Sequence, residues 1–123
     1  MRFLLDTHVL LWWLANDSRL SEPHRSLIAD RTNFVLVSSI SIAEVSIKAS
    51  LGKLEAPANT HDAALQSGFG LLSFEAAHAE ELRELPWIHR DPFDRMLVAQ
   101  ARIEKLRLLT ADARIRQYDV LHG

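Results

Sequence analysis

Short apolar runs alternate along this chain with longer segments of helical spacing, and this alternation constrains the fold more than any other feature. The runs lie at residues 2–5, 34–37, 70–73 and 106–110, and residues 118–121 predict a further one. Apolar runs this short are typical of strands buried on both faces, as in parallel sheets. Parallel strands need crossover helices, so the pattern predicts an α/β fold with a short central parallel sheet flanked by helices.

The segments between the runs carry signals of helix starts and stops. Ser21 and Asp91 each precede a first turn that contains proline, which is a common helix start, and Gly52 is a candidate helix end. We expect helices over about residues 7–15, 22–31, 39–54, 61–67, 75–85 and 92–105. The third of these carries an apolar stripe made of Ile40, Ala43, Ile47, Leu51 and Leu54. On the last helix, Arg95 and Arg102 are expected on the polar face.

Composition narrows the class of protein. The 123 residues are expected to form a single domain, residues 1–123. The absence of Cys excludes disulfide scaffolds and thiolate zinc sites. A net charge of −2 argues against a broad surface for polyanions, although residues 90–123 hold seven basic and five acidic side chains. The longest apolar run, residues 9–15, is too short to span a membrane, so we expect a cytoplasmic protein without membrane contact.

Four acidic residues occupy places where a parallel sheet brings side chains together. Asp6 follows the first strand and Asp112 follows the last clear one. Each of these two, taken alone, is also a good helix cap or turn residue. Glu44 and Asp94 lie beside the apolar stripes of their helices, where a carboxylate is costly unless it is paired or bound to a cation. An ion pair with Lys48, one turn further on, is an equally good interpretation of Glu44.

Taken together, the four acids indicate more than each does alone. Ligands of parallel α/β sheets bind just beyond the carboxyl ends of the strands, which is where these side chains are expected to meet. Carboxylates that converge without a cation repel one another. Oxygen donors without Cys suit Mg²⁺, with Mn²⁺ as a substitute. The sequence therefore predicts a metal site that consists of Asp6, Glu44, Asp94 and Asp112.

Four short motifs, in order along the whole chain, resemble those of a known family. They are LLDT at 4–7, SIAE at 41–44, DRMLVAQA at 94–101 and LLTAD at 108–112. The order of the acids and the spacing of the last two are similar to the acidic quartet of the PIN-domain ribonucleases. Within that family the chain resembles the VapC-like toxins of type II toxin–antitoxin pairs, and HRDPFD at 89–94 looks like one of their subgroups. The resemblance implies a PIN-like three-layer fold.

The resemblance also implies an activity and partners. Asp6, Glu44, Asp94 and Asp112 would be catalytic and would hold one or two Mg²⁺ ions in an endoribonuclease that hydrolyses RNA phosphodiester bonds. The expected product ends are 5′-phosphate and 3′-hydroxyl. Thr7 and Thr110 would orient the carboxylates. The implied partners are an RNA substrate, a cognate antitoxin protein and a second copy of the chain in a homodimer.

Several alternatives stay open at this point. If its acids serve merely as helix caps, the chain is a PIN-like scaffold that binds without catalysing a reaction. A phosphoacceptor receiver domain has a similar length and an acidic Mg²⁺ pocket, but it needs paired acids after the first strand and a Lys after the last. Asp91 either caps its helix or holds a metal-bound water. The apolar first helix offers a partner surface if Trp12 or Trp13 is exposed, and otherwise both belong to the core.

Overall fold

A four-stranded parallel sheet forms the centre of the molecule. The computed structural model describes all residues, 1–123. The strands are β1 (Arg2–Leu5), β2 (Phe34–Ser38), β3 (Gly70–Leu72) and β4 (Arg107–Leu109), in the order β3-β2-β1-β4. Leu4 of β1 lies opposite Leu36 on one side and Leu108 on the other. The predicted α/β fold with a short parallel sheet is confirmed.

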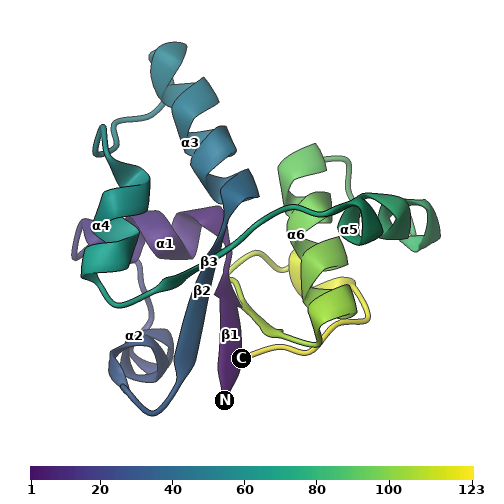
Figure 1. The fold of residues 1–123 in the computed structure, drawn as a ribbon, viewed down its shortest axis with the longest axis horizontal. Coiled ribbons are helices and arrows are strands. Elements are labelled where there is room, and N and C mark those ends of the chain that lie inside the picture. Colours follow the sequence, from purple (N-terminus) through teal and green to yellow (C-terminus); the bar gives the residue numbers. More distant parts are fainter.

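Helices cover both faces of the sheet. They are α1 (Thr7–Leu14), α2 (Glu22–Ala29), α3 (Ser39–Ser50), α4 (Thr60–Gln66), α5 (Ala76–Glu81) and α6 (Pro92–Glu104), with 3₁₀ turns at Leu82–Glu84 and Ile115–Gln117. Figure 1 shows α1, α2 and α4 on one side of the sheet and α5 and α6 on the other, while α3 extends away from the end of β2. These three layers match the predicted architecture. No helix is both long and apolar enough to cross a membrane.

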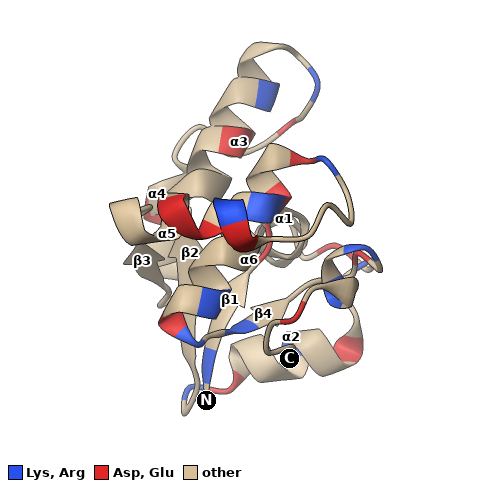
Figure 2. Ribbon diagram, turned by 90° about the vertical axis from the view of Figure 1, so that its right-hand side faces the viewer, with Lys and Arg blue, Asp and Glu red and all other residues tan.

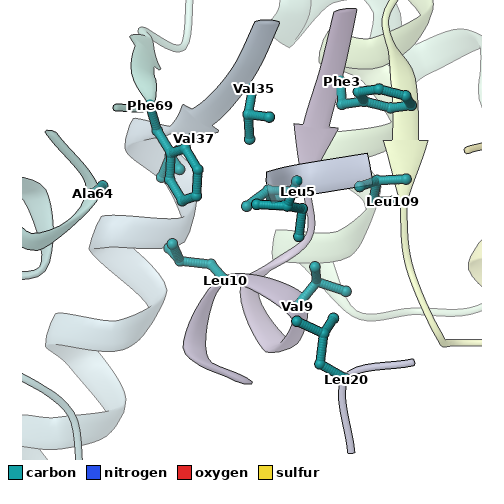
Figure 3. Packing of buried hydrophobic residues seen from close by; sticks show 11 residues of the cluster. Phe3, Leu5, Val9, Leu10, Leu20, Val35, Val37, Ala64, Phe69 and Leu109 are labelled. Atoms are coloured by element: carbon teal, nitrogen blue, oxygen red, sulfur yellow. The ribbon is translucent and has the colours of Figure 1, made fainter. Parts of the chain in front are cut away.

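The two faces of the sheet bury separate apolar clusters. Successive strand residues point to opposite faces, so Phe3 and Leu5 pack under α1 while Leu4 packs under α6. Figure 3 shows the first cluster, in which side chains of β1, β2 and β4 meet Val9 and Leu10 of α1. Both faces are therefore covered, as the unbroken apolar runs predict.

Of the two alternatives left open for Trp12 and Trp13, the structure supports packing against the core. Val9 and Leu10 are fully buried in the core. Trp12 and Trp13 are half-buried and pack against the same cluster, and the indole N–H of Trp13 donates to Ser67 Oγ at 3.3 Å. The apolar character of α1 therefore reflects core packing.

The predicted third helix is too long and its apolar stripe lies on the wrong face. α3 ends at Ser50, because Gly52 adopts a φ of +70° and the N–H of Lys53 bonds the carbonyl of Lys48, as in a Schellman motif. Its buried residues are Ser41, Glu44 and Val45. The predicted stripe is exposed at Ile47 and Leu51, which are 48% and 61% accessible.

Two further expectations from the C-terminal third differ from the structure. Residues 118–121 form no strand, and the tail joins the sheet only through a single bridge between Leu108 and His122. Arg95 does not lie on a polar outward face: it is buried, whereas Arg102 is half-exposed and pairs with Glu81. The buried Arg95 has polar partners at the C-terminal turn and before α6, which helical periodicity does not reveal.

Candidate functional site

Four elements bring acidic side chains to the carboxyl end of the sheet. Asp6 directly follows β1, Glu44 lies in the second turn of α3 after β2, Asp94 lies in the first turn of α6, and Asp112 follows β4. Parallel strands end at the same edge, which explains this gathering. The charges of the other three all act on Asp94, and the charge of Asp112 also acts on Asp6.

Asp6 is both a helix cap and a buried carboxylate. It is the N-cap of α1 and accepts a hydrogen bond from the Val9 N–H at 2.8 Å. Only 3% of the residue is exposed. Burial raises the pKa of the Asp6 carboxyl, although bonds from Thr110 and Val9 oppose that rise. Capping alone does not need so deep a position, because Ser21 caps α2 from an exposed one.

Glu44 is buried with a cation beside it. The residue is 2% exposed, and its Oε1 accepts a hydrogen bond from Thr7 Oγ1 at 2.7 Å. Its other oxygen forms an ion pair with Lys48. The open alternative of a Glu44–Lys48 pair is therefore present in the structure. The expected contact between Thr7 and a site carboxylate is present as well.

Asp94 has no Lys or Arg partner among the ion pairs of the molecule. Its side chain is 15% exposed, and its one charged-group contact is His89 Nε2, 3.3 Å from Oδ2. Burial and then the charges of Asp91, Asp6, Glu44 and Asp112 raise the pKa of Asp94 to about 7. The cationic side chains at the site therefore do not balance all of the negative charge around Asp94.

Asp112 and Asp91 have local structural roles. Burial raises the pKa of Asp112, but hydrogen bonds and charge from Arg114 outweigh it, so the pKa lies below its usual value. The Arg114 N–H donates to Asp112 Oδ1 at 2.8 Å, and the guanidinium lies 3.2 Å from Oδ2. Asp91 caps α6, accepting from the N–H groups of Phe93 and Asp94. The cap interpretation of Asp91 is confirmed.

A buried network behind Asp94 was missed from the sequence. His89 Nδ1 lies 2.8 Å from the Tyr118 hydroxyl, which also accepts a hydrogen bond from Arg95 at 3.0 Å. Burial and the charge of Arg114 lower the pKa of His89. The network joins the segment before α6 to the C-terminal turn. The motif at 89–94 was the available signal, because it places a His directly before the helix cap of the Asp94 helix.

The acids are not arranged as a ready ligand set. No group of three or more His, Asp or Glu side chains lies close enough together to hold a metal ion as the side chains stand. Lys48 and Arg114 occupy oxygens of Glu44 and Asp112. Figure 2 shows Lys and Arg interspersed with Asp and Glu in that view, without a wholly basic side.

Comparisons with known proteins agree on the fold. The structure is similar to a VapBC2 complex of Rickettsia felis bound to a promoter DNA fragment, with TM-score 0.72 and 18% identity over 99% of this chain and 96% of that one. It is similar to a DNA-bound VapBC of Salmonella typhimurium, with TM-score 0.70 and 16% identity over 99% and 96% of the two chains. For FitAcB of Neisseria gonorrhoeae the TM-score is 0.65 and the identity 23%, over 98% and 95%.

The sequence itself also matches a family model, although no curated protein matches the chain. The family model described as the PIN domain matches residues 3–121, which is nearly the whole chain. The chain therefore belongs to the PIN-domain family.

Proposed function

We propose that this protein is a metal-dependent endoribonuclease and the toxin of a toxin–antitoxin pair. The observation that carries the proposal is the gathering of four carboxylates, from four different elements, at the carboxyl edge of a PIN-domain sheet. One of them, Asp94, is largely buried without a cation partner. A structural role does not require such an arrangement, because an unpaired buried carboxylate costs folding free energy.

The chemistry of these residues fits Mg²⁺ or Mn²⁺. The donors are oxygens only, and the charge that surrounds Asp94 is in excess. Asp6 and Asp94 would hold the ion, together with Glu44 and Asp112 once an incoming cation competes with Lys48 and Arg114. When bound, Mg²⁺ would supply positive charge where negative charge develops on the phosphodiester group. Thr7 orients Glu44 for this role, and His89 orients Asp94.

The structural relatives support one of the proposed partners, an antitoxin protein. Those of Rickettsia felis and Salmonella typhimurium are VapBC complexes. We infer that this chain likewise pairs with a small antitoxin, that it forms a homodimer, and that it acts on RNA in the cytoplasm. Hydrolysis would leave 5′-phosphate and 3′-hydroxyl ends.

A binding scaffold without catalysis is the second candidate, and specific contacts favour it. Glu44 and Asp112 have cation partners within the chain, and Asp6 is a helix cap. A thermal-shift titration with Mn²⁺ separates the two candidates. A rise in melting temperature that depends on Asp94 supports the enzyme, and no response supports the scaffold.

The direct test is cleavage of single-stranded RNA by the purified protein. We expect internal cleavage that needs Mg²⁺ or Mn²⁺ and stops with EDTA. Asp94→Asn should reduce the rate by roughly 10²–10³-fold, the range expected when an electrostatic group of a catalytic site is removed. Glu80→Gln, which removes one charge from an exposed position on α5, is the matched control and should cut as the parent does. Cleavage that persists in EDTA, or in Asp94→Asn, contradicts the proposal.

A further inference from the structure

Trp87 is an exposed aromatic side chain that the acidic site does not use. It is 76% accessible, the highest exposure of any large apolar residue in the molecule. The residues two positions away on either side, Leu85 and His89, are 4% and 7% accessible. The chain is therefore anchored on both sides of an indole that remains in solvent. Core packing does not explain that position.

The buried Arg95 supports one face of this indole. Its guanidinium carbon lies 3.8 Å from the centroid of the Trp87 ring, a close cation–π contact. Arg95 is 4% exposed, and its nitrogens donate to the Pro86 carbonyl at 2.8 Å and to the Tyr118 hydroxyl at 3.0 Å. The cation is thus fixed by the fold, and the ring that rests on it is held in one orientation. The high exposure of Trp87 leaves its other face free.

The indole borders a shallow hollow on the surface of the segment before α6. Trp87, Ile88, His89 and Arg90 line this hollow. The imidazole of His89, which lines the hollow together with Trp87, lies 3.3 Å from Asp94 Oδ2, so one side chain borders both the hollow and the candidate catalytic carboxylate. Arg90 is exposed and adds a positive charge at the rim.

We propose that Trp87 is a stacking platform for one nucleobase of single-stranded RNA, placed beside the acidic site. A preoriented aromatic face accepts the π-face of any base, and the charge of Arg90 suits the adjoining phosphate. The RNA must be unpaired there, because bases within a duplex already stack on their neighbours. A protein partner fits this surface less well, since two of the four residues that line the hollow, His89 and Arg90, are polar, and no wide apolar patch surrounds the indole. The inference rests on the proposed function, because it specifies the substrate of the same site.

The test compares two probes with and without the aromatic ring. Fluorescence anisotropy in EDTA measures binding of a labelled short oligoadenylate and of an abasic phosphodiester chain of the same length. We expect the parent to prefer the oligoadenylate, and Trp87→Ala to lose about ten- to hundredfold in affinity for it, as removal of one base stack does. Affinity for the abasic chain should not change. Trp87→Phe should retain most of the affinity, because its ring still stacks.

Phe34→Ala is the matched control. Phe34 is 71% exposed at the start of β2, at the opposite end of the strand from the acids, and should bind both probes as the parent does. Unchanged oligoadenylate binding by Trp87→Ala overturns the inference. An equal loss of affinity for both probes in Trp87→Ala also overturns it. So does a Trp87→Ala variant that no longer binds the antitoxin but keeps its affinity for RNA. Base-dependent binding by a parent that cleaves no RNA supports the platform while contradicting the nuclease.

Discussion

Helices α3 and α6 each carry a carboxylate to the same edge of the sheet, but they treat its charge differently. On α3, Glu44 has Lys48 one turn further along and the Thr7 hydroxyl at its other oxygen. On α6, Asp94 has only the His89 imidazole, whose pKa is itself lowered by burial. Helix α3 thus balances its buried charge locally, whereas α6 leaves the charge of Asp94 unbalanced.

The packing of the two helices differs in the same direction. α6 buries a continuous stretch, Leu97–Ala101, between the sheet and the neighbouring helices α3 and α5. α3 buries only three residues and extends away from the sheet with Ile47 exposed. A well-packed helix holds an unfavourable charge in place, since the free energy of its core contacts offsets the cost. If the proposed function is correct, the external cation would therefore bind at α6, beside the unbalanced Asp94.

The largest expected effect concerns the pH dependence of metal-free stability. The pKa of Asp94 is about 7 in the folded protein against 3.8 for the free side chain. A raised carboxyl pKa stabilises the folded state fully below about pH 4, and this contribution is lost as the pH rises through about 7. The parent should lose on the order of 4 kcal/mol of unfolding free energy from this group across that window. Urea unfolding in EDTA at several pH values measures it.

Asp94→Asn removes this titration. At pH 8 the variant should be more stable than the parent without metal, by a margin that shrinks toward pH 4, because the parent is then protonated. Loss of favourable charge at the start of α6 opposes the gain by only about 0.3–1 kcal/mol. Glu80→Gln should follow the parent. A variant that is less stable at pH 8 would show that Asp94 is an ordinary helix-terminus charge.

A smaller effect is expected from the balanced charge on α3. Lys48→Met leaves Glu44 buried without its cation, which should destabilise the metal-free protein by about 1–2 kcal/mol. This destabilisation is smaller than the one expected for a fully buried ion pair, because the Lys48 side chain is 35% exposed. Added Mn²⁺ should reduce the loss. Lys53→Met, at an exposed position just beyond the same helix, is the control. An equal loss of stability in that variant would show that the loss in Lys48→Met does not come from the unpaired Glu44.

The sequence predicts the sheet and the gathering of the acids for one physical reason. Strand ends and helix caps are local, so Asp6 after β1 and Asp91 before α6 reveal themselves through short-range patterns. The partners of these groups are not local. His89 reaches Tyr118 across 29 residues, and the buried Arg95 donates to the same hydroxyl and to the Pro86 carbonyl. Local periodicity favoured an outward position for Arg95, and tertiary contacts overrode it.

The apolar stripe of α3 shows the same limit and leads to the smallest predicted effect. Ile47 is 48% exposed, so Ile47→Gln should change the unfolding free energy by no more than about 0.5 kcal/mol. Val45→Ala on the same helix, where Val45 is 2% exposed, should cost roughly 1–3 kcal/mol, because it leaves a cavity. Urea unfolding at two protein concentrations measures both. If Ile47→Gln costs as much as Val45→Ala, and more at the higher concentration, then a second copy of the chain covers this face of α3. In that case the exposed stripe would be the contact surface of the proposed homodimer, and the weak packing of α3 within one chain would be compensated between two.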